Sequence, residues 1–288
     1  MLRAGTCATL AAMETPFGLV LAFVSALAVN WAYAREHDAV AGMAPFSARE
    51  PLRFVSTLFA NRRWLVGFAT ESAGWLVYVA ALRLAPISLV QAICASGIAV
   101  LAFVSAQGHP GRLARPAQAA VVVAFAGLVL LSVSLTGEPQ LDHAPDPAAV
   151  ALWLACAAAG GIVLAVSGLG LVRAAALGLA AGVLFAGGDI CSKLVGYGGT
   201  WLLAALALVA FYVLGTSLLQ GAFQHGDALT AAGLATLATN AVPIAAGFVV
   251  FGEELPGGAK GTLQLAAFAS LVVSGALLAG LKKRADTA

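Results

Sequence analysis

The chain has 288 residues, of which 61% are hydrophobic and only 10% are charged, and its formal net charge is +2. Soluble domains are roughly 45–50% apolar and about 25% charged, so this composition excludes an ordinary soluble domain and indicates a polytopic α-helical membrane protein. The sequence contains no H-E-x-x-H, G-x-S-x-G or P-loop motif, and topology explains its basic residues. We therefore expect neither an enzyme nor a nucleic-acid-binding protein.

Apolar runs of about 20 residues, long enough to cross a bilayer, recur between polar breaks along the whole chain. We predict nine spans, at 15–34, 64–85, 86–106, 117–136, 148–167, 174–194, 201–223, 228–251 and 262–281. The predicted fold class is therefore all-α integral membrane. Its parts are a leader (1–14), a first membrane repeat (15–136), a linking helix (148–167), a second membrane repeat (174–281) and a cytoplasmic tail (282–288).

The leader precedes a second methionine, Met13, and shows no clear periodicity. A rival hypothesis makes residues 1–34 a signal peptide that is cleaved after Ala32-Tyr33-Ala34. The internal repeat described below argues against cleavage, because a helix of the second repeat would lose its counterpart. We therefore keep the first span and expect the leader to be dispensable.

Lysine and arginine are distributed unequally between the two sets of alternating loops. One set carries Arg3, Arg83, Lys193 and Lys260, and the other carries the remaining 11 of the 15 basic residues. The positive-inside rule places the richer set in the cytoplasm. We expect an inner-membrane protein with its N-terminus outside and its C-terminus in the cytoplasm.

The two halves of the chain resemble each other. Residues 80–113 and 221–255 each contain a span end, a tight polar break, a small-residue span and a glycine-containing loop, and 18–33 parallels 178–193. The two copies start five spans apart, an odd number, so they cross the membrane in opposite directions. Such inverted repeats are typical of secondary transporters, whose site lies near the midplane between the copies.

The loop after the small-residue span carries a recognisable motif. It reads FGEEL at 251–255, GRL at 111–113 occupies the matching place in the first repeat, and Lys193 ends the first span of the second repeat. In these residues the chain resembles the EamA-like branch of the drug/metabolite transporter superfamily. The resemblance implies two inverted four-helix repeats and the transport of a small solute or metabolite.

A narrower resemblance covers residues 62–106. RWLVG at 63–67, Glu71, YVA at 78–80 and APISLV at 85–90 are similar to the second and third spans of the NIPA-type magnesium transporters, which also have nine spans. The motifs that this family carries directly after the glutamate and after the Leu-Val pair are missing. The resemblance implies divalent-cation transport as the alternative function.

Two acidic residues lie within the predicted spans, Glu71 and Asp189, and the other eleven are assigned to loops or tails. An ionised carboxylate in a bilayer costs about 2.5–3.5 kcal/mol on insertion scales, so such residues usually face a pathway. We interpret Glu71 as a proton or cation site on that pathway, with a structural hydrogen bond as the alternative. Lys193 follows Asp189 by four residues on one helix face, so this pair forms an ion pair or Asp189 contacts the solute.

Four amide side chains lie within spans: Asn30, Gln91, Gln220 and Asn240. Pro243, which follows Asn240, frees a backbone carbonyl that suits a polar wall or is satisfied within a kink. Aromatic residues in spans are expected to be interface anchors or packing residues; they include Tyr33, Trp75, Tyr78 and Tyr212. A stripe that contains Gly178 and Gly182 predicts close helix packing.

The sequence thus favours a secondary transporter whose pathway includes Glu71, Asn30, Gln91, Asp189, Lys193 and Asn240. In the alternative, Glu71 and Asp189 bind a divalent cation, with oxygens from Asn30 and Asn240. A non-transporting membrane scaffold is the third hypothesis. No cofactor is expected; the partners are the solute or ion, the bilayer and, if the chain self-associates, a second copy in a homodimer.

Overall fold

The computed structural model describes residues 2–43, 51–84, 90, 93–94, 97–106, 114–134, 145–167, 171–250 and 257–285. Three sequence features lie outside these residues: Gln91, the loop that contains 111–113, and the FGEEL segment at 251–255.

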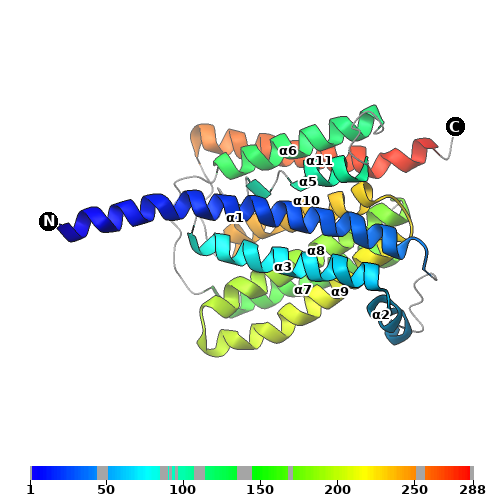
Figure 1. Cartoon of the computed structure of the whole chain (residues 1–288), viewed down its shortest axis with the longest axis horizontal. Coiled ribbons are helices and arrows are strands. Elements are labelled where there is room, and N and C mark those ends of the chain that lie inside the picture. The colour runs from blue at the N-terminus through cyan, green and yellow to red at the C-terminus, as the bar shows by residue number, and fades with distance from the viewer. Residues whose placement is uncertain are drawn as a thin grey trace.

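Helices account for the described part of the chain, and no strand occurs in it. They are α1 (Leu2–Val40), α2 (Pro51–Ala60), α3 (Arg62–Leu84), α5 (Gly97–Ser105), α6 (Arg115–Ser134), α7 (Pro147–Ser167), α8 (Arg173–Gly196), the short 3-10 helix η3 (Gly199–Leu203), α9 (Ala204–Phe223), α10 (Ala228–Val250) and α11 (Gly258–Ala285). Figure 1 shows them as one elongated bundle.

Five helical segments are long and apolar enough to cross a bilayer. They are Pro16–Val40, Pro147–Ser167, Arg173–Gly196, Gly199–Phe223 and Gly258–Leu278. Helices α3, α6 and α10 coincide with three further predicted spans, and α5 covers the end of the third one. The fold is therefore all-helical and of membrane type, as the composition predicts.

Helix α1 is longer at both ends than the predicted span 15–34. Its backbone is helical from Leu2, so the predicted leader and the first span form one helix. It continues to Val40 because the segment AREHDAV contains neither glycine nor proline, the residues that most often end a helix. The chain leaves the helix near Gly42.

This extension corrects one prediction. The assignment of all acids except Glu71 and Asp189 to loops or tails is wrong, because Glu36 lies in the last two turns of α1. Its side chain is fully buried, with 0% exposed. A buried acid usually has a partner.

The start of α3 is fixed by a capping residue. Asn61 accepts hydrogen bonds through Oδ1 from the backbone N–H groups of Arg63 (3.0 Å) and Trp64 (3.3 Å), as N-cap residues do. The preceding residues lie outside the predicted spans, but they form helix α2. The Phe59 ring of α2 packs edge-on against Trp64, with ring centroids 5.4 Å apart. The cap and this contact set the depth at which α3 presents Glu71.

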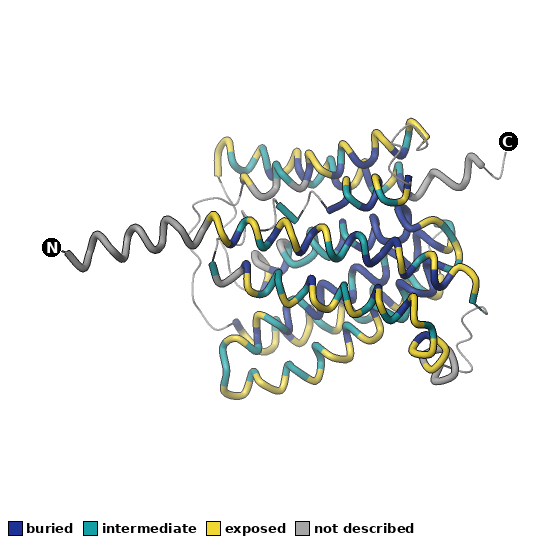
Figure 2. The backbone as a smooth tube through the Cα atoms, in the orientation of Figure 1, coloured by how far each residue is buried: buried dark blue, intermediate teal, exposed yellow. Residues whose placement is uncertain are grey.

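The helices pack in two similar groups. In the first, α1 packs against α3 and α5; in the second, α8 packs against α9 and α10; α6 of the first half packs along α11 of the second. Helix α8 is the most buried of the five candidate spans, whereas α7 and α9 are exposed along their outer faces (Figure 2).

The prediction of close packing at the small-residue stripe is confirmed. A Cβ atom added to Gly178 or Gly182 on α8 would collide with the backbone of α10, at the carbonyl oxygens of Ala231 and Ala235. Only glycine permits this approach, so α8 and α10 form a tightly joined pair at the side of the cavity.

Candidate functional site: an acidic cavity between the two halves

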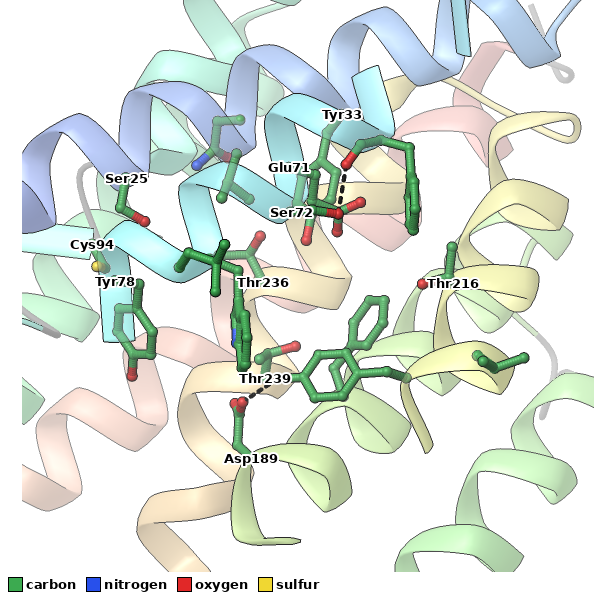
Figure 3. Close-up of a pocket in the computed structure, with 18 of the residues that line it drawn as sticks. Ser25, Tyr33, Glu71, Ser72, Tyr78, Cys94, Asp189, Thr216, Thr236 and Thr239 are labelled. Carbon is green, nitrogen blue, oxygen red and sulfur yellow. Dashed lines mark hydrogen bonds between the residues drawn. The ribbon is translucent and has the colours of Figure 1, made fainter. Parts of the chain in front are cut away.

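A cavity of about 620 Å³ lies between helices from both halves of the chain. Its walls come from α1 and α3 on one side and from α8, α9 and α10 on the other, with two residues of α2 at one edge. This volume falls in the range of small-molecule sites, about 300–1,000 Å³. Figure 3 shows Glu71 on one side of the cavity and Asp189 on the other.

The structure brings together four of the six residues that the sequence analysis named for the pathway. Glu71, Asp189, Asn30 and Asn240 all line the cavity, although they come from four different helices. Lys193 is exposed and is not one of the lining residues. Gln91 lies outside the described residues.

Glu71 is part of a polar cluster that the sequence analysis did not foresee. Its carboxyl group is in hydrogen-bonding contact with the carboxyl group of Glu36 and with the hydroxyl of Tyr33, both on α1. Gln220 of α9 donates a hydrogen bond from Nε2 to Glu36 Oε2. The cluster therefore joins α1 and α3 to a helix of the second half, deep inside the bundle.

The carboxyl groups of Glu36 and Glu71 lie close enough to interact. An ionised carboxylate is an acceptor only, so two carboxyl groups form a hydrogen bond only when one is protonated. Glu36 Oε1 and Glu71 Oε2 are buried, and neither receives a hydrogen bond from any described N–H or hydroxyl group. A proton shared by the two groups would supply the missing donor and would remove the repulsion between two adjacent negative charges.

Asp189 has a separate partner on the other side of the cavity. The Tyr212 hydroxyl donates a hydrogen bond of 2.6 Å to Asp189 Oδ1, which Figure 3 shows as the lower dashed line. The Tyr212 ring also contacts the rings of Trp75 at 6.1 Å and Phe185 at 5.7 Å between centroids. The acid is thus held by an aromatic group that links α3, α8 and α9. Whether Asp189 also pairs with Lys193 stays a prediction.

Aromatic side chains form much of the wall. They are Tyr33, Phe59, Trp64, Phe68, Trp75, Tyr78, Phe185 and Tyr212. The rings of Trp64 and Phe68 are stacked, with centroids 5.0 Å apart and planes at 10°. Four residues that the sequence analysis treated as anchors or packing therefore border the cavity: Tyr33, Trp75, Tyr78 and Tyr212.

The two asparagines that line the cavity are each hydrogen-bonded to their own helix. Asn30 donates from Nδ2 to the Ala26 carbonyl (2.9 Å), and Asn240 donates from Nδ2 to the Thr236 carbonyl (2.7 Å). These bonds to the preceding helical turn hold each amide nitrogen against its own helix. Asn30 Oδ1 is buried and has no donor among the described residues.

The cavity contains acidic and aromatic groups without a basic one. No lysine, arginine or histidine is among its described lining residues. The described residues also include no group of three or more His, Cys, Asp or Glu side chains that could hold a metal ion. The site can therefore accept a proton or a positively charged group without displacing a basic side chain of its own.

Glu36 and Gln220 are the members of this polar cluster to which the sequence analysis gave no role. A signal for Glu36 was available: Asn30, Tyr33 and Glu36 recur every three residues on α1, and neither glycine nor proline lies between Asn30 and Gly42. The predicted span 15–34 ends just before Arg35, where the polar run begins. Arg35 instead turns outward and lies over the ring of Trp31, 4.8 Å from its centroid.

Fold and cavity together define the class: a helical protein of membrane type with an acidic, aromatic-walled cavity inside the bundle. No family model, curated protein or solved structure matches this chain significantly. The likeness to the EamA-like carriers and to the NIPA-type transporters therefore stays an expectation from the sequence motifs.

Proposed function

We propose that the protein is a secondary transporter of the EamA-like type that moves a small solute across the inner membrane. The observation that carries the proposal is that Glu71 and Asp189, from different halves of the chain, border one cavity of about 620 Å³. Inverted-repeat transporters have their site between the repeats. Glu71 acts as a proton or cation site within this pathway.

The packing of the helices supports the proposed inverted repeats. The first helix of each half, α1 or α8, packs on the second and third helices of that half. The fourth helices, α6 and α11, pack on each other. An internal two-fold relation between four-helix units would give this pattern.

The proposed nine spans agree with the position of the chain ends. Figure 1 shows α1 beginning and α11 ending at opposite ends of the bundle, as an odd number of crossings requires. The orientation that we propose, with the C-terminus in the cytoplasm, rests on the distribution of lysine and arginine.

Divalent-cation transport is the second candidate, because Glu71, Asp189, Asn30 and Asn240 bring oxygen atoms to the same cavity. Magnesium prefers oxygen ligands and keeps several of its waters, so a few carboxylates can suffice. The aromatic walls favour a carbon-containing solute over a hydrated ion, and this ranks the carrier of small organic solutes first.

The test is transport by the purified protein in proteoliposomes. A panel of amines, amino acids, sugars, organic acids and magnesium is offered with and without a pH gradient. We expect flux of at least one solute, a change in that flux with the gradient, and loss of flux or of its pH dependence in Glu71→Gln. Asp38→Asn removes an exposed acid of the same helix as Glu36 and should transport normally. If no solute moves with any gradient, the scaffold hypothesis gains and the carrier proposal fails.

A further inference from the structure

Helix α2 is too short to cross a membrane and lies at one end of the bundle. Its 10 residues extend about 15 Å at 1.5 Å per residue, half of the roughly 30 Å of a hydrocarbon core. Figure 1 shows it beside the start of α3, at the end of the bundle where α1 finishes. The surface of the membrane is therefore the environment of α2.

The residues of α2 divide into a polar and an apolar face. Helical spacing places positions 53, 56, 57 and 60 on one side, and the sequence has Arg, Ser, Thr and Ala there. Ser56, Thr57 and Ala60 are exposed. Leu58, on the opposite side, is only 4% exposed and belongs to the cavity wall. Amphipathic helices with such faces lie in the plane of the membrane interface.

Phe59 stands between the two faces of α2. Its ring is 52% exposed, although it packs edge-on against Trp64 and Phe68 of α3, with centroids 5.4 Å and 6.2 Å away. The same residue lines the cavity. If α2 lies in the interface, the exposed part of this ring meets acyl chains next to the headgroups, and apolar surface is removed from water.

The sequence around α2 is positively charged. Residues 51–63 include three arginines and neither aspartate nor glutamate. Arg62 and Arg63 are exposed and occupy the first turn of α3. A cation in the first turn meets the positive end of the helix dipole, so these arginines do not stabilise α3. Their charge suits an anion outside the chain.

We propose that α2, Arg62 and Arg63 form a docking surface for anionic phospholipids of the cytoplasmic leaflet. The polar face of α2 lies among the headgroups, Phe59 meets the acyl chains, and the arginines bind the lipid phosphates. Phosphatidylglycerol, whose headgroup carries a net negative charge, represents this class of lipid. Phosphatidylcholine fits less well because its headgroup also carries a positive charge.

Lipid bound at this surface acts on the edge of the cavity, and this effect rests on the proposed transport function. Asn61, directly after α2, caps α3 and donates a hydrogen bond from Nδ2 to the Ala39 carbonyl oxygen of α1 (3.4 Å). A change in the position of α2 among the headgroups shifts Leu58 and Phe59 at the cavity edge. We therefore expect solute flux to depend on anionic lipid.

The test compares the full-length protein in two kinds of nanodisc, one of phosphatidylcholine alone and one in which part of it is replaced by phosphatidylglycerol. Hydrogen–deuterium exchange, followed by mass spectrometry of peptides that cover 51–60, measures the protection of α2. We expect exchange to be at least about fivefold slower with phosphatidylglycerol, the factor that one basic residue contributes near an anionic surface. High salt should remove the difference because it screens exposed charges.

A matched pair of variants locates the effect. Arg62 and Arg115 are both exposed, and each is the first residue of its helix, α3 or α6. Both belong to the predicted cytoplasmic set, but only Arg62 follows α2. We expect Arg62→Gln to lower the lipid-dependent protection of 51–60 by about fivefold, and Arg115→Gln to retain it. The comparison of the two nanodiscs uses the parent protein, so it decides the question even if a variant fails to fold.

Inorganic phosphate added to the phosphatidylcholine nanodiscs distinguishes a lipid surface from a site for a free anion. Three outcomes would overturn the docking surface: equal exchange in the two nanodiscs, full protection of α2 by inorganic phosphate alone, or equal loss of protection in the two variants. Solute flux in proteoliposomes together with any of these would leave the transporter proposal intact. Protection of α2 by phosphatidylglycerol without flux in either lipid would remove the transport function and keep the surface. Protection with equal flux in both lipids would remove only the effect on the cavity edge.

Discussion

Gly67 of α3 makes the room in which the Glu36 side chain lies. A Cβ atom added to Gly67 would lie 2.7 Å from Glu36 Cγ, closer than any relaxed carbon–carbon contact. The same Cβ would lie 3.4 Å from the carbonyl oxygen of Ala32. The glycine therefore lets α1 and α3 approach closely enough for the carboxyl groups of Glu36 and Glu71 to interact.

A methyl group at Gly67 should disturb the carboxyl pair without changing any charge. We expect Gly67→Ala to lower stability by about 1–3 kcal/mol because it overpacks the α1–α3 contact, although alanine has the better helix propensity. Thermal unfolding in detergent, followed by size-exclusion chromatography, measures the effect. Gly160→Ala is the matched control, since no atom lies within 4 Å of its added Cβ, and it should unfold at or above the parent temperature. Equal behaviour of both variants would show that the contact is relieved at little cost.

Glu36 and Glu71 should behave as one titrating unit. If a single proton belongs to the pair, removing either carboxyl group removes that proton, and the double change adds little. We expect Glu36→Gln, Glu71→Gln and the double variant to show the same loss of pH dependence in solute flux. Flux is measured across a series of external pH values in proteoliposomes. A Glu36→Gln protein with a normal pH profile would restrict the role of Glu36 to packing.

The Tyr212 hydroxyl should matter for Asp189 independently of the Tyr212 ring. Tyr212→Phe retains the contacts with Trp75 and Phe185 but leaves Asp189 Oδ1 without its 2.6 Å donor. Leaving a buried acid unpaired costs roughly 1–3 kcal/mol, so we expect a measurable drop in thermal stability. Combining it with Asp189→Asn should restore part of the loss, because the amide carries no charge to desolvate. Additive losses in the double variant would show that the two side chains act separately.

Topology gives a test that does not depend on the solute. The segment at 138–147 is predicted to lie outside and the end of the chain at Ala288 in the cytoplasm. Alkaline phosphatase is active only after export, so a fusion within 138–147 should be active and a fusion after Ala288 inactive. The opposite pattern would reverse the proposed orientation, and activity of both fusions would require an even number of crossings between them.

The sequence was sufficient for the helical class and for much of the cavity wall. Composition indicated a membrane protein, and the cost of a buried charge singled out Glu71 and Asp189 as pathway residues. Both line the cavity. Glu71 and Asp189 could be singled out from the sequence because the desolvation of a charge is a local penalty, which a single acid within an apolar run reveals.

The partners of these acids were not predictable in the same way. Gln220 meets Glu36 across 184 positions of sequence, and the Tyr212 hydroxyl reaches Asp189 from a neighbouring helix. Such contacts depend on how helices rotate and cross, which hydrophobic periodicity does not specify when almost every position is apolar. The omission of Glu36 has a simpler reason: the polar run that begins at Arg35 is read as the break after the first span, and Glu36 falls within that run.

The hydrogen bond from Gln220 to Glu36 joins α9 of the second half to α1 of the first. A carrier that opens alternately to each side moves its halves relative to each other, and this bond lies across that boundary. A change in the protonation of Glu36 then changes the strength of its hydrogen bond with Gln220. Conversely, movement of the halves changes the affinity of Glu36 for its proton. Thermodynamic reciprocity requires that the two effects have the same free energy. The proton would thus be an allosteric ligand of the bundle as well as an ion that it carries.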